Sequence, residues 1–500
     1  MHTLFHILIE ETIGSYAGIY FLLVGDILAL VSAPSVLRRR RGRPVSALSW
    51  LLALFLVPYL GVAFWWMVGR ERLKRKRRAR QQSSEKFHES LDHAPDAEAE
   101  SKLREFIPIL PRGLFEAHDS QSLSGPTAGN HVDLLVDGDD GFEAMERMIR
   151  SAEDYVHLLF YIWDDDETGQ RLLDLLVEKA REGVEVRLLV DPIGSPSLDS
   201  SFGEPLRQAG GEIGKFLPPR YIAWEPTFNF RNHRKLIVSD GVEAYTGGMN
   251  VGDEYAHEWH DLGVRVRGPA VRDLEEVFLE DWFFATDNDL VEQDPKYLKP
   301  SPKRQEESDR QLWGHSSICT VCASGPDRPD EKGSALRDLF FHAAAGAEDR
   351  LWITTPYFVP GSEFVAGLKA AVQRGVDVRL LLPRDGGVPV VRHASRAFYP
   401  MLLNGGVRIW EYQPRILHAK AMLIDDRFAF VGSANVDVRS FEINFELGAL
   451  ISSEALNDEL SKVFEAGLEQ SREVTLEDTE NLPWHHALLD GVAHLLSPYL

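Results

Sequence analysis

The sequence predicts an α/β fold built from two similar halves. From residue 131 onward, short apolar runs alternate with stretches of helical spacing, and the same alternation returns from residue 351. The run Gly183-Val-Glu-Val-Arg-Leu-Leu-Val is repeated almost unchanged as Gly375-Val-Asp-Val-Arg-Leu-Leu-Leu. Strands that alternate with helices indicate a largely buried sheet covered by helices. We therefore expect two mixed-sheet halves with flanking helices.

The elements of each half follow from the spacing of apolar residues. In the first half we expect strands at 132–136, 155–163 and 184–190, and helices at 141–152 and 168–182. In the second half we expect strands at 351–358 and 375–382, with a helix at 363–374 between them. The chain is thus an internal duplication.

A short motif occurs once in each half. The pattern His-x-Lys-x4-Asp lies at His233, Lys235 and Asp240, and again 185 positions later at His418, Lys420 and Asp425. Three further pairs obey the same offset, namely Gly247 and Gly432, Asn250 and Asn435, and Asp261 and Glu446. A common offset for every pair indicates one duplicated half-site.

Each motif leads into a predicted tight β-hairpin. An apolar run ends at Asp240-Gly241 and a second run follows, which is typical of such a turn. Asp240 and Asp425 therefore have a framework role in the turns as an alternative to a place in the site. Residues two apart on a strand lie on one face at roughly 7 Å spacing, so each His–Lys pair should point into one site.

The duplicated part is preceded by a different kind of sequence. Residues 17–36 and 47–68 are apolar stretches close to the roughly 20 residues that a bilayer requires. Basic clusters at 38–43 and 70–80 follow them, so we expect an N-terminal transmembrane helical hairpin. Eight basic residues after the second stretch, against five after the first, favour a cytoplasmic location for the duplicated part.

These patterns divide the chain into six parts. We expect two transmembrane helices with basic flanks in 1–80, a linker and irregular segment in 81–130, and the first half in 131–290. A connector is expected in 291–314, the second half in 315–476 and a C-terminal tail in 477–500, which packs on the body or touches the bilayer surface.

Charge and cysteine content exclude several classes of protein. The net charge is −23, and residues 81–500 alone carry −32, which counts against a non-specific nucleic-acid binder. Cys319 and Cys322 have the C-x-x-C spacing of redox or zinc sites, but no second pair completes a zinc site. Their odd separation places them on opposite faces of a strand, so we interpret them as ordinary core residues.

Two histidines and two lysines in one site suit phosphodiester chemistry. One histidine can attack unprotonated while the other donates a proton to the leaving oxygen. The two lysines, with Asn250, Ser433 and Asn435, can stabilise the phosphate charge in place of a metal, so no metal or cofactor is predicted. Asp261 and Glu446 can each orient and charge-stabilise a histidine.

The two motifs, with the Gly247-Gly248-x-Asn250 and Gly432-Ser433-x-Asn435 segments that follow them, resemble those of the phospholipase D superfamily. Nearly the whole chain resembles the bacterial cardiolipin synthases more narrowly. The residues that carry this likeness are the N-terminal apolar pair, the segments at 228–235, 355–360 and 417–420, the run Asn435-x-Asp437-x-Arg439-Ser440-Phe441, and Leu496-Ser497-Pro498 near the end.

The resemblance implies a duplicated phospholipase D-like sandwich with a pseudo-twofold active site. The implied reaction transfers a phosphatidyl group from one phosphatidylglycerol to another, releasing glycerol through a phosphohistidine. The resemblance counts Asp240 and Asp425 as site residues and favours His233 as nucleophile and His418 as general acid.

The resemblance also implies the protein's surroundings. Its expected partners are phosphatidylglycerol and membrane phospholipids rather than nucleic acid, and its location is the bacterial cytoplasmic membrane, which it spans more than once. The oligomeric state stays open. Alternative functions are a phospholipase D that uses water or another alcohol as acceptor and, more remotely, a nuclease of the same fold.

Overall fold

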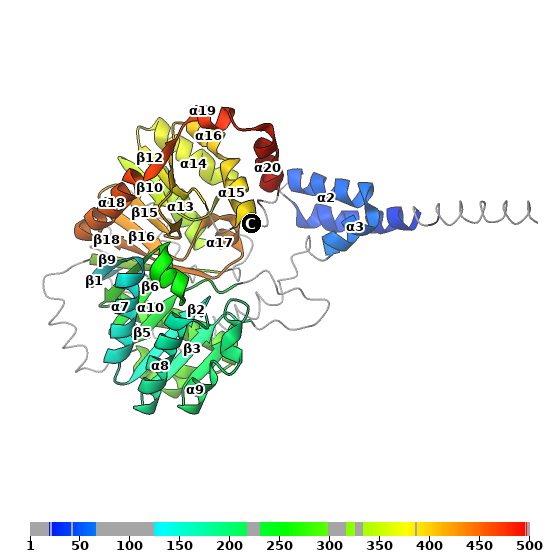
Figure 1. The fold of residues 1–500 in the computed structure, drawn as a ribbon. Helices are drawn as coiled ribbons and strands as arrows, with labels where there is room; N and C mark the ends of the chain where they lie inside the picture. The colour runs from blue at the N-terminus through cyan, green and yellow to red at the C-terminus, as the bar shows by residue number, and fades with distance from the viewer. Residues whose placement is uncertain are drawn as a thin grey trace, which may run out of the picture. The chain divides into compact units, whose positions relative to one another are not determined.

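The computed structural model describes residues 20, 23–41, 44–66, 125–217, 231–298, 317–325, 334–385, 388–495 and 497. The chain divides into two compact units, a small helical unit (residues 1–78 with 220–227) and a large body (79–219 with 228–500). Both copies of the His-x-Lys motif belong to the body. Figure 1 shows the described elements of both units along the chain.

One fifteen-stranded sheet runs through the body. In sheet order, the first half contributes β1 (Thr127–Val136), β8 (Leu262–Arg267), β6 (Glu243–Gly247), β5 (Leu236–Ser239), β2 (Tyr155–Phe160), β3 (Glu185–Val190) and β4 (Glu212–Lys215). The second half contributes β9 (Ser317–Ser324), β18 (Glu446–Ser452), β16 (Phe428–Gly432), β15 (Ala421–Ile424), β10 (Arg350–Thr354), β12 (Asp377–Pro383), β13 (Arg408–Tyr412) and β19 (Ser471–Val474).

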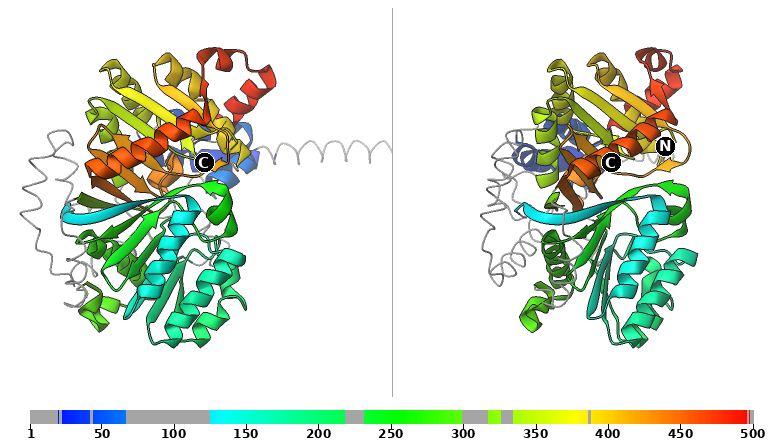
Figure 2. Two further views of the ribbon diagram at one scale, coloured as in Figure 1. Left: turned by 60° about the vertical axis from the view of Figure 1, so that its left-hand side comes forward. Right: turned by 90° about the vertical axis from the view of Figure 1, so that its left-hand side faces the viewer.

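The two halves of this sheet mirror each other. They meet where β1 pairs antiparallel with β9, and moving outward from that junction each strand of the first half has a counterpart in the second, which adds β19 at its outer edge. In each half the outer strands β2–β3–β4 and β10–β12–β13 are parallel, whereas the inner strands are antiparallel. The predicted pair of mixed-sheet halves is therefore confirmed, and the halves share one continuous sheet (Figure 2).

Helices cover both faces of each half. The outer face of the first half packs on α7 (Asp137–Ser151) and α8 (Glu167–Arg181), and that of the second half on α13 (Ala335–Gly346), α14 (Ser362–Gln373), α15 (Pro389–Arg396) and α16 (Tyr399–Asn404). The inner faces share a third core with α10 (Ala270–Thr286) and α18 (Glu454–Glu469).

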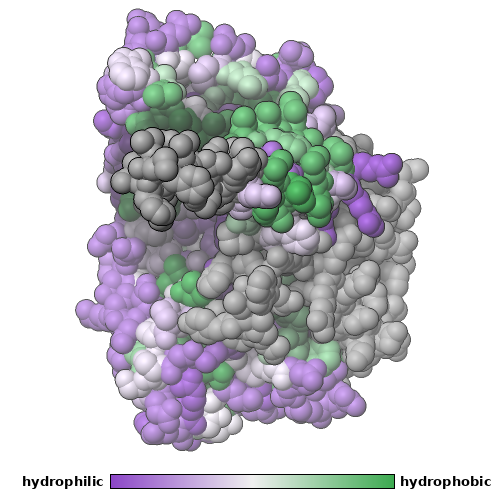
Figure 3. All heavy atoms as spheres, turned by 90° about the vertical axis from the view of Figure 1, so that its right-hand side faces the viewer, coloured by the Kyte–Doolittle hydropathy of each residue, from purple (hydrophilic) through white to green (hydrophobic). Residues whose placement is uncertain are grey.

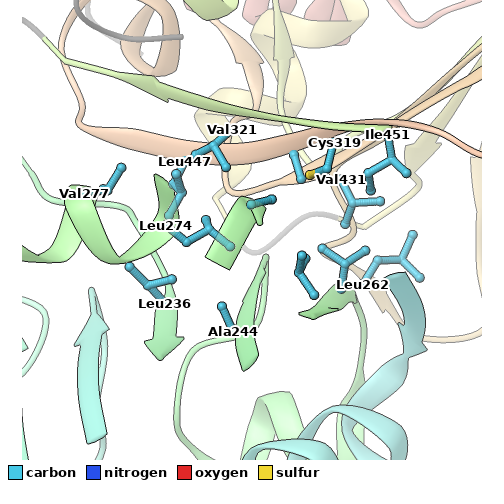
Figure 4. Close-up of a cluster of buried hydrophobic side chains, with 14 of the residues drawn as sticks. Leu236, Ala244, Leu262, Leu274, Val277, Cys319, Val321, Val431, Leu447 and Ile451 are labelled. Atoms are coloured by element: carbon cyan, nitrogen blue, oxygen red, sulfur yellow. The ribbon is translucent and has the colours of Figure 1, made fainter. Parts of the chain in front are cut away.

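The shared core joins the two halves through apolar contact. Figure 4 shows Leu236, Ala244 and Leu262 of the first half close to Val321, Val431 and Leu447 of the second. Burial of such side chains contributes on the order of 1.5–3 kcal/mol each for the larger ones. Because this core draws on both halves, neither half buries its inner face alone.

The two cysteines lie on opposite faces of β9, as predicted. Cys319 is in the shared core and Cys322 is in the outer core of the second half. Both are free thiols, and burial raises the pKa of Cys322 to about 12. A thiol held in its protonated form is a poor nucleophile and metal ligand, which agrees with a packing role.

The hairpin turns hold the motif aspartates in the left-handed region. Asp240 and Gly241 have φ values of 51° and 67°, as a two-residue turn of type I′ requires. The carboxylate of Asp240 accepts hydrogen bonds from the backbone N–H groups of Glu153, Asp154 and Tyr155 at 2.8–2.9 Å. It therefore fixes the start of β2 to the end of β5.

The second copy repeats this arrangement. Asp425 has φ 51°, and its carboxylate accepts from the N–H groups of Glu348, Asp349 and Arg350 at the start of β10. Both aspartates lie seven residues beyond their histidine along an extended chain, a span of roughly 20 Å. The framework alternative thus describes the contacts of both residues.

Several predicted boundaries also change. Strand β1 begins at Thr127, so the irregular segment predicted to reach residue 130 ends earlier. Helix α11 (Leu290–Gln293) and the turn Pro295–Leu298 follow α10 directly. Tyr297 in that turn is buried and donates a hydrogen bond to Glu185 on β3, so this part of the predicted connector belongs to the first half.

The helical unit differs from the predicted hairpin. Residues 23–39 are helical, and the second apolar stretch forms α2 (Pro44–Leu56) and α3 (Pro58–Phe64). Pro58 separates these two helices because proline lacks the N–H that continues a helix. Within the described residues, no helix combines the length and apolarity needed to cross a bilayer. The second predicted span is therefore two short helices, and the first lies partly outside the described residues.

The unit is held together by contacts between its helices. Trp66 donates a hydrogen bond to Ser32 at 3.0 Å and Trp65 donates one to Ser35 at 3.3 Å. Many of its other apolar side chains are exposed, including Leu56 at 76% and Val31 at 68%. Hydrophobic residues form a contiguous area on the face displayed in Figure 3. Exposure on this scale is typical of a surface that meets a membrane or another apolar partner.

We predict that Asp425→Asn lowers the stability of the body. The amide NH₂ would face backbone donors that now bind a carboxylate, which costs about 1–3 kcal/mol. Asp426→Asn is the matched control, because Asp426 is 84% exposed and its ion pair with Arg350 lies at the surface. Thermal unfolding in detergent should show a lower midpoint for Asp425→Asn alone, and equal midpoints for the two variants would refute the framework role.

Candidate active site

The two histidine segments are exchanged between the halves. Asn232, next to His233, forms a parallel β-bridge with Phe445 of the second half. In the second copy, β14 (Ile416–Leu417) pairs in parallel with β7 (Trp259–His260), so that Leu417 lies opposite His260 of the first half. These two contacts are related by the 185-residue offset. In each copy, the segment that leads to the histidine therefore pairs with a strand segment of the opposite half.

Backbone hydrogen bonds fix each histidine in this position. The N–H of His233 donates to the carbonyl of Phe445, and the N–H of His418 donates to the carbonyl of His260, both at 2.8 Å. The next residues along these strands are Glu446 and Asp261. Each half therefore presents a carboxylate directly beside the histidine of the other half.

The side chains form two crossed histidine–carboxylate pairs. His418 Nδ1 lies 2.5 Å from Asp261 Oδ2, and His233 Nδ1 lies 3.4 Å from Glu446 Oε2. The short contact assigns the proton to Nδ1 of His418 and leaves Nε2 as the reactive nitrogen. The longer contact holds His233 more loosely, because N–H···O hydrogen bonds fall mostly between 2.7 and 3.2 Å. Asp261 and Glu446 are thus the carboxylates that lie beside the two histidines.

The two carboxylates have different surroundings. Glu446 accepts hydrogen bonds from the Ser433 hydroxyl at 2.6 Å and from the Asn444 amide at 3.1 Å. Asp261 accepts one from the backbone N–H of Leu262 at 2.8 Å. At the position equivalent to Ser433, Gly248 leaves room for Asp261, because a Cβ there would lie 2.1 Å from Asp261 Oδ1. A serine thus donates a hydrogen bond to the longer glutamate, and a glycine at the equivalent position leaves space for the shorter aspartate.

The two lysines lie beneath the histidines. Lys235 is fully buried and Lys420 is 1% exposed, whereas the side chains of His233 and His418 remain 17% and 11% exposed. Lys235 Nζ donates to the carbonyl of His233 at 2.7 Å, and Lys420 Nζ donates to the carbonyl of His418. Lys420 Nζ also lies 3.8 Å from Asp261 Oδ2. The histidines therefore form the accessible layer of the site and the charged groups its base.

Burial and mutual charge shift the titration of the four basic groups. Burial lowers the pKa of His233 most, and the positive charge of Lys235 lowers it further, whereas Glu446 raises it. Burial and Lys420 lower the pKa of His418 to about 3, against the opposing effect of Asp261. Burial lowers the pKa of Lys235 to about 7 and that of Lys420 to about 8. At neutral pH the imidazole of His418 is therefore neutral.

The carboxylates stay charged in this setting. Burial alone would raise their pKa values, but Lys420 and His418 lower the pKa of Asp261, and His233 and Lys235 lower that of Glu446. A phosphodiester anion entering the site would add negative charge beside the histidines and raise their pKa values. The arrangement is therefore suited to proton uptake that accompanies binding of an anionic substrate.

Aromatic rings line the site beside each histidine. The Tyr161 ring lies 4.7 Å from that of His233, and the Trp259 and Tyr255 rings lie 4.8 and 5.5 Å from that of His418. Sequence reasoning missed these residues. A signal was present for Trp259, because it lies two positions before Asp261 on an extended segment and so shares its face.

The predicted asparagines take different positions. The side-chain oxygen of Asn250 accepts a hydrogen bond from the N–H of Ile162 at 3.1 Å. Asn435 is 4% exposed, and its side-chain oxygen is buried without a hydrogen-bond partner among the described residues. Asn250 therefore holds the end of β2 in place, while Asn435 keeps an unused polar atom.

Arg234 is a further residue that sequence reasoning did not single out. It is buried, pairs with Asp281 at 2.8 Å, and donates to the carbonyls of Glu446 and Ser324 in the second half. The equivalent position in the other copy is Ala419. This one-sided contact ties the strand that carries Glu446 to the first half.

Comparison with known families agrees with this architecture. A family model described as "Cardiolipin synthase, PLD-like domain" matches residues 145–282 and 341–468, one segment in each half. A second model, described as "Phospholipase_D-nuclease N-terminal", matches residues 26–70. Together these matches cover both units.

Curated relatives match almost end to end. The cardiolipin synthase of Halalkalibacterium halodurans is 33% identical over 494 residues, which cover 97% of this chain and 95% of that protein. The cardiolipin synthase of Alkalihalophilus pseudofirmus is 34% identical over 467 residues, which cover 91% of this chain and 89% of that protein.

A solved structure has the same fold. The crystal structure of phosphatidylserine synthase from Haemophilus influenzae superposes with a TM-score of 0.55 at 15% identity, covering 74% of this chain and 95% of that one. With the duplicated half-sites and the full-length matches, this chain belongs to the cardiolipin synthase family of the phospholipase D superfamily.

Proposed function

We propose that the protein is a cardiolipin synthase that transfers a phosphatidyl group between two phosphatidylglycerol molecules and releases glycerol. The observation that supports this most strongly is the pair of crossed histidine–carboxylate contacts above two buried lysines, in a chain that matches curated cardiolipin synthases over nearly its full length. Such a site supplies a nucleophile, a proton donor and positive charge for a phosphodiester.

In the first step, His233 Nε2 attacks the phosphorus of one phosphatidylglycerol. A nitrogen–phosphorus bond forms while the bond from phosphorus to the glycerol oxygen breaks. His418, protonated at Nε2 once the anionic substrate is bound, gives its proton to that oxygen, and glycerol leaves. The products of this step are a phosphatidyl-histidine and a neutral His418.

In the second step, His418 removes the proton from a glycerol hydroxyl of the second phosphatidylglycerol. The resulting oxygen nucleophile attacks the phosphatidyl group, the nitrogen–phosphorus bond breaks, and His233 is restored. The product is cardiolipin, and His418 ends the cycle protonated.

The contacts of the two histidines support this division of labour. His418 lies 2.5 Å from Asp261, so its imidazolium has a close anionic partner, as a proton carrier needs. His233 is 3.4 Å from Glu446 and is also the more exposed of the two side chains. In the alternative assignment His418 is the nucleophile and His233 the general acid. The adduct experiment below distinguishes the two assignments.

Lys235 and Lys420 supply the positive charge for the phosphate oxygens. Their ammonium groups lie in a buried setting, where charge is weakly screened and stabilises the developing negative charge more than it would in water. We assign Asn435 to the same task through its side-chain NH₂ group, which can donate a hydrogen bond to a phosphate oxygen. Ser433 and Asn250 act as supports, one of Glu446 and one of the chain after β2.

We further propose that the helical unit inserts into the bacterial cytoplasmic membrane and brings the body to its lipid substrate, with the body on the cytoplasmic side. Its exposed apolar side chains and the basic clusters at 38–43 and 70–80 support this. Membranes washed with alkaline carbonate should retain the full chain, and release of the protein into the wash would contradict insertion.

Purified full-length protein in detergent should convert phosphatidylglycerol to cardiolipin and release one glycerol for each cardiolipin formed. Thin-layer chromatography and an enzymatic glycerol assay measure the two products. Phosphatidic acid without cardiolipin would instead indicate a hydrolase. Because the lysines supply the positive charge, activity should persist after EDTA treatment, and a loss restored by a divalent ion would refute this mechanism.

Substitutions of Asp261 and Asp240 should have different effects on kcat. Asp261→Asn removes the anionic partner of His418 and should lower kcat by about 100-fold or more, since general acid–base assistance is worth 10²–10⁴-fold. Asp240→Asn should lower kcat far less in the fraction that remains folded. Steady-state rates normalised to folded protein decide the question, and a larger loss in Asp240→Asn would return that residue to the site.

His418→Ala protein should accumulate the covalent intermediate when it is given a phosphatidyl donor with a good leaving group. Such a donor needs no proton, so His233 can attack, whereas the second step lacks its base. Acid quenching and peptide mass spectrometry should locate a phosphatidyl increment on the peptide that contains His233. An adduct on His418 in His233→Ala protein, with none in His418→Ala, would reverse the two roles.

A further inference from the structure

The C-terminal helix α20 (Trp484–Leu495) presents its apolar side chains to solvent. Trp484, Leu488, Val492 and Leu495 recur every three or four residues and are 77%, 57%, 51% and 76% exposed. The buried positions of the same helix are Asp490 and Ala493. A helix of a soluble body normally buries its apolar stripe, so the orientation of α20 is inverted.

Polar contacts hold α20 in this orientation. Asp490 Oδ1 lies 2.6 Å from His393 Nδ1 on α15, and its other oxygen lies 3.6 Å from Arg396. The ring of His494 packs edge-on against Phe398 at 4.9 Å. The polar side of the helix therefore packs on the body. A rotation that buried the apolar stripe would break the contacts of Asp490 with His393 and Arg396.

A cationic cavity lies next to this helix. Its volume is about 320 Å³, and its lining includes Thr479 and Leu482, which precede α20 in the chain. Four arginines also line it: Arg384, Arg392, Arg396 and Arg472. Two acidic side chains, Glu411 and Asp478, are the only carboxylates in the described lining. The cavity walls thus carry an excess of positive charge.

Two of the four arginines are incompletely satisfied by the described residues. Arg384 forms no ion pair with any described residue, and the Nε of Arg392 is buried without a hydrogen-bond partner in the same part of the chain. The carboxylate paired with Arg392, Asp385, is 79% exposed, so this pair contributes little. Guanidinium groups with free donors favour phosphate, which they bind in a forked geometry.

We propose that α20 and this cavity form a second lipid-binding surface, in which the helix lies in the membrane interface and the arginines bind the phosphate of an anionic phospholipid. Apolar residues with a terminal tryptophan beside cationic groups are the combination that binds an anionic membrane surface. A protein partner would match the apolar stripe but not the adjoining phosphate-binding chemistry. The binding requires neither His233 nor His418, so it goes beyond the proposed function.

The test uses the full chain with Leu488→Cys carrying a polarity-sensitive fluorophore. The native cysteines are buried and stay unlabelled. The protein is placed in nanodiscs of phosphatidylcholine alone or of phosphatidylcholine with phosphatidylserine, an anionic lipid other than the proposed substrate. We expect a blue shift in the anionic discs that exceeds the shift in neutral discs. A label at Glu178→Cys, on the exposed face of α8, should not shift in either.

Charge variants test the cavity. Arg384→Gln with Arg392→Gln should at least halve the lipid-dependent shift, whereas the matched pair Arg181→Gln with Arg427→Gln, at exposed positions elsewhere, should leave it unchanged. No shift in any disc would overturn the proposal. An equal shift in both discs, or its removal by millimolar inorganic phosphate, would overturn the role of the lipid phosphate.

Discussion

The site depends on the exchange of two short backbone segments between the halves. Each histidine segment forms parallel β contacts with the residue that precedes the opposite carboxylate, at Asn232 with Phe445 and at Leu417 with His260. Backbone pairing of this kind fixes the register of the two segments. A slip by one residue would turn each side chain to the other face, so the pairing also determines where each side chain points. The crossed histidine–carboxylate contacts are the consequence.

This exchange makes the two halves interdependent. Lys235, Lys420, Asp261 and Glu446 are almost fully buried, and ions taken out of water remain stable only when they are paired. Each half contributes one lysine and one carboxylate, but each carboxylate has its closest basic partner in the other half. An isolated half would leave a buried carboxylate without its histidine. The shared apolar core also makes the halves interdependent, since it holds both of them in place around the buried charged residues.

The duplicated half-sites have diverged in detail. A glutamate with a serine donor serves His233, whereas an aspartate beside a glycine serves His418. Arg234 has a counterpart in Ala419, and the second histidine segment is instead tied to the first half by Arg415, which pairs with Asp137 at 2.6 Å. The two histidine–carboxylate distances, 3.4 and 2.5 Å, also differ. Two copies of one motif can in this way carry out opposite steps of a proton-transfer cycle, because each imidazole has a different environment.

The sequence by itself determined the two-half α/β fold, the hairpins and the set of paired site residues, because these rest on local periodicity and on a constant offset between copies. It left the role of Asp240 and Asp425 open, and it placed the first residues of strand β1 and the residues after α10 outside the first half. Only the tertiary structure decided that the aspartates bind backbone amides, that Asp261 and Glu446 cross to the opposite histidines, and that Tyr161 and Trp259 line the site. The physical reason is that pairing across the interface depends on which backbones meet in space, and local spacing along the chain does not carry that information.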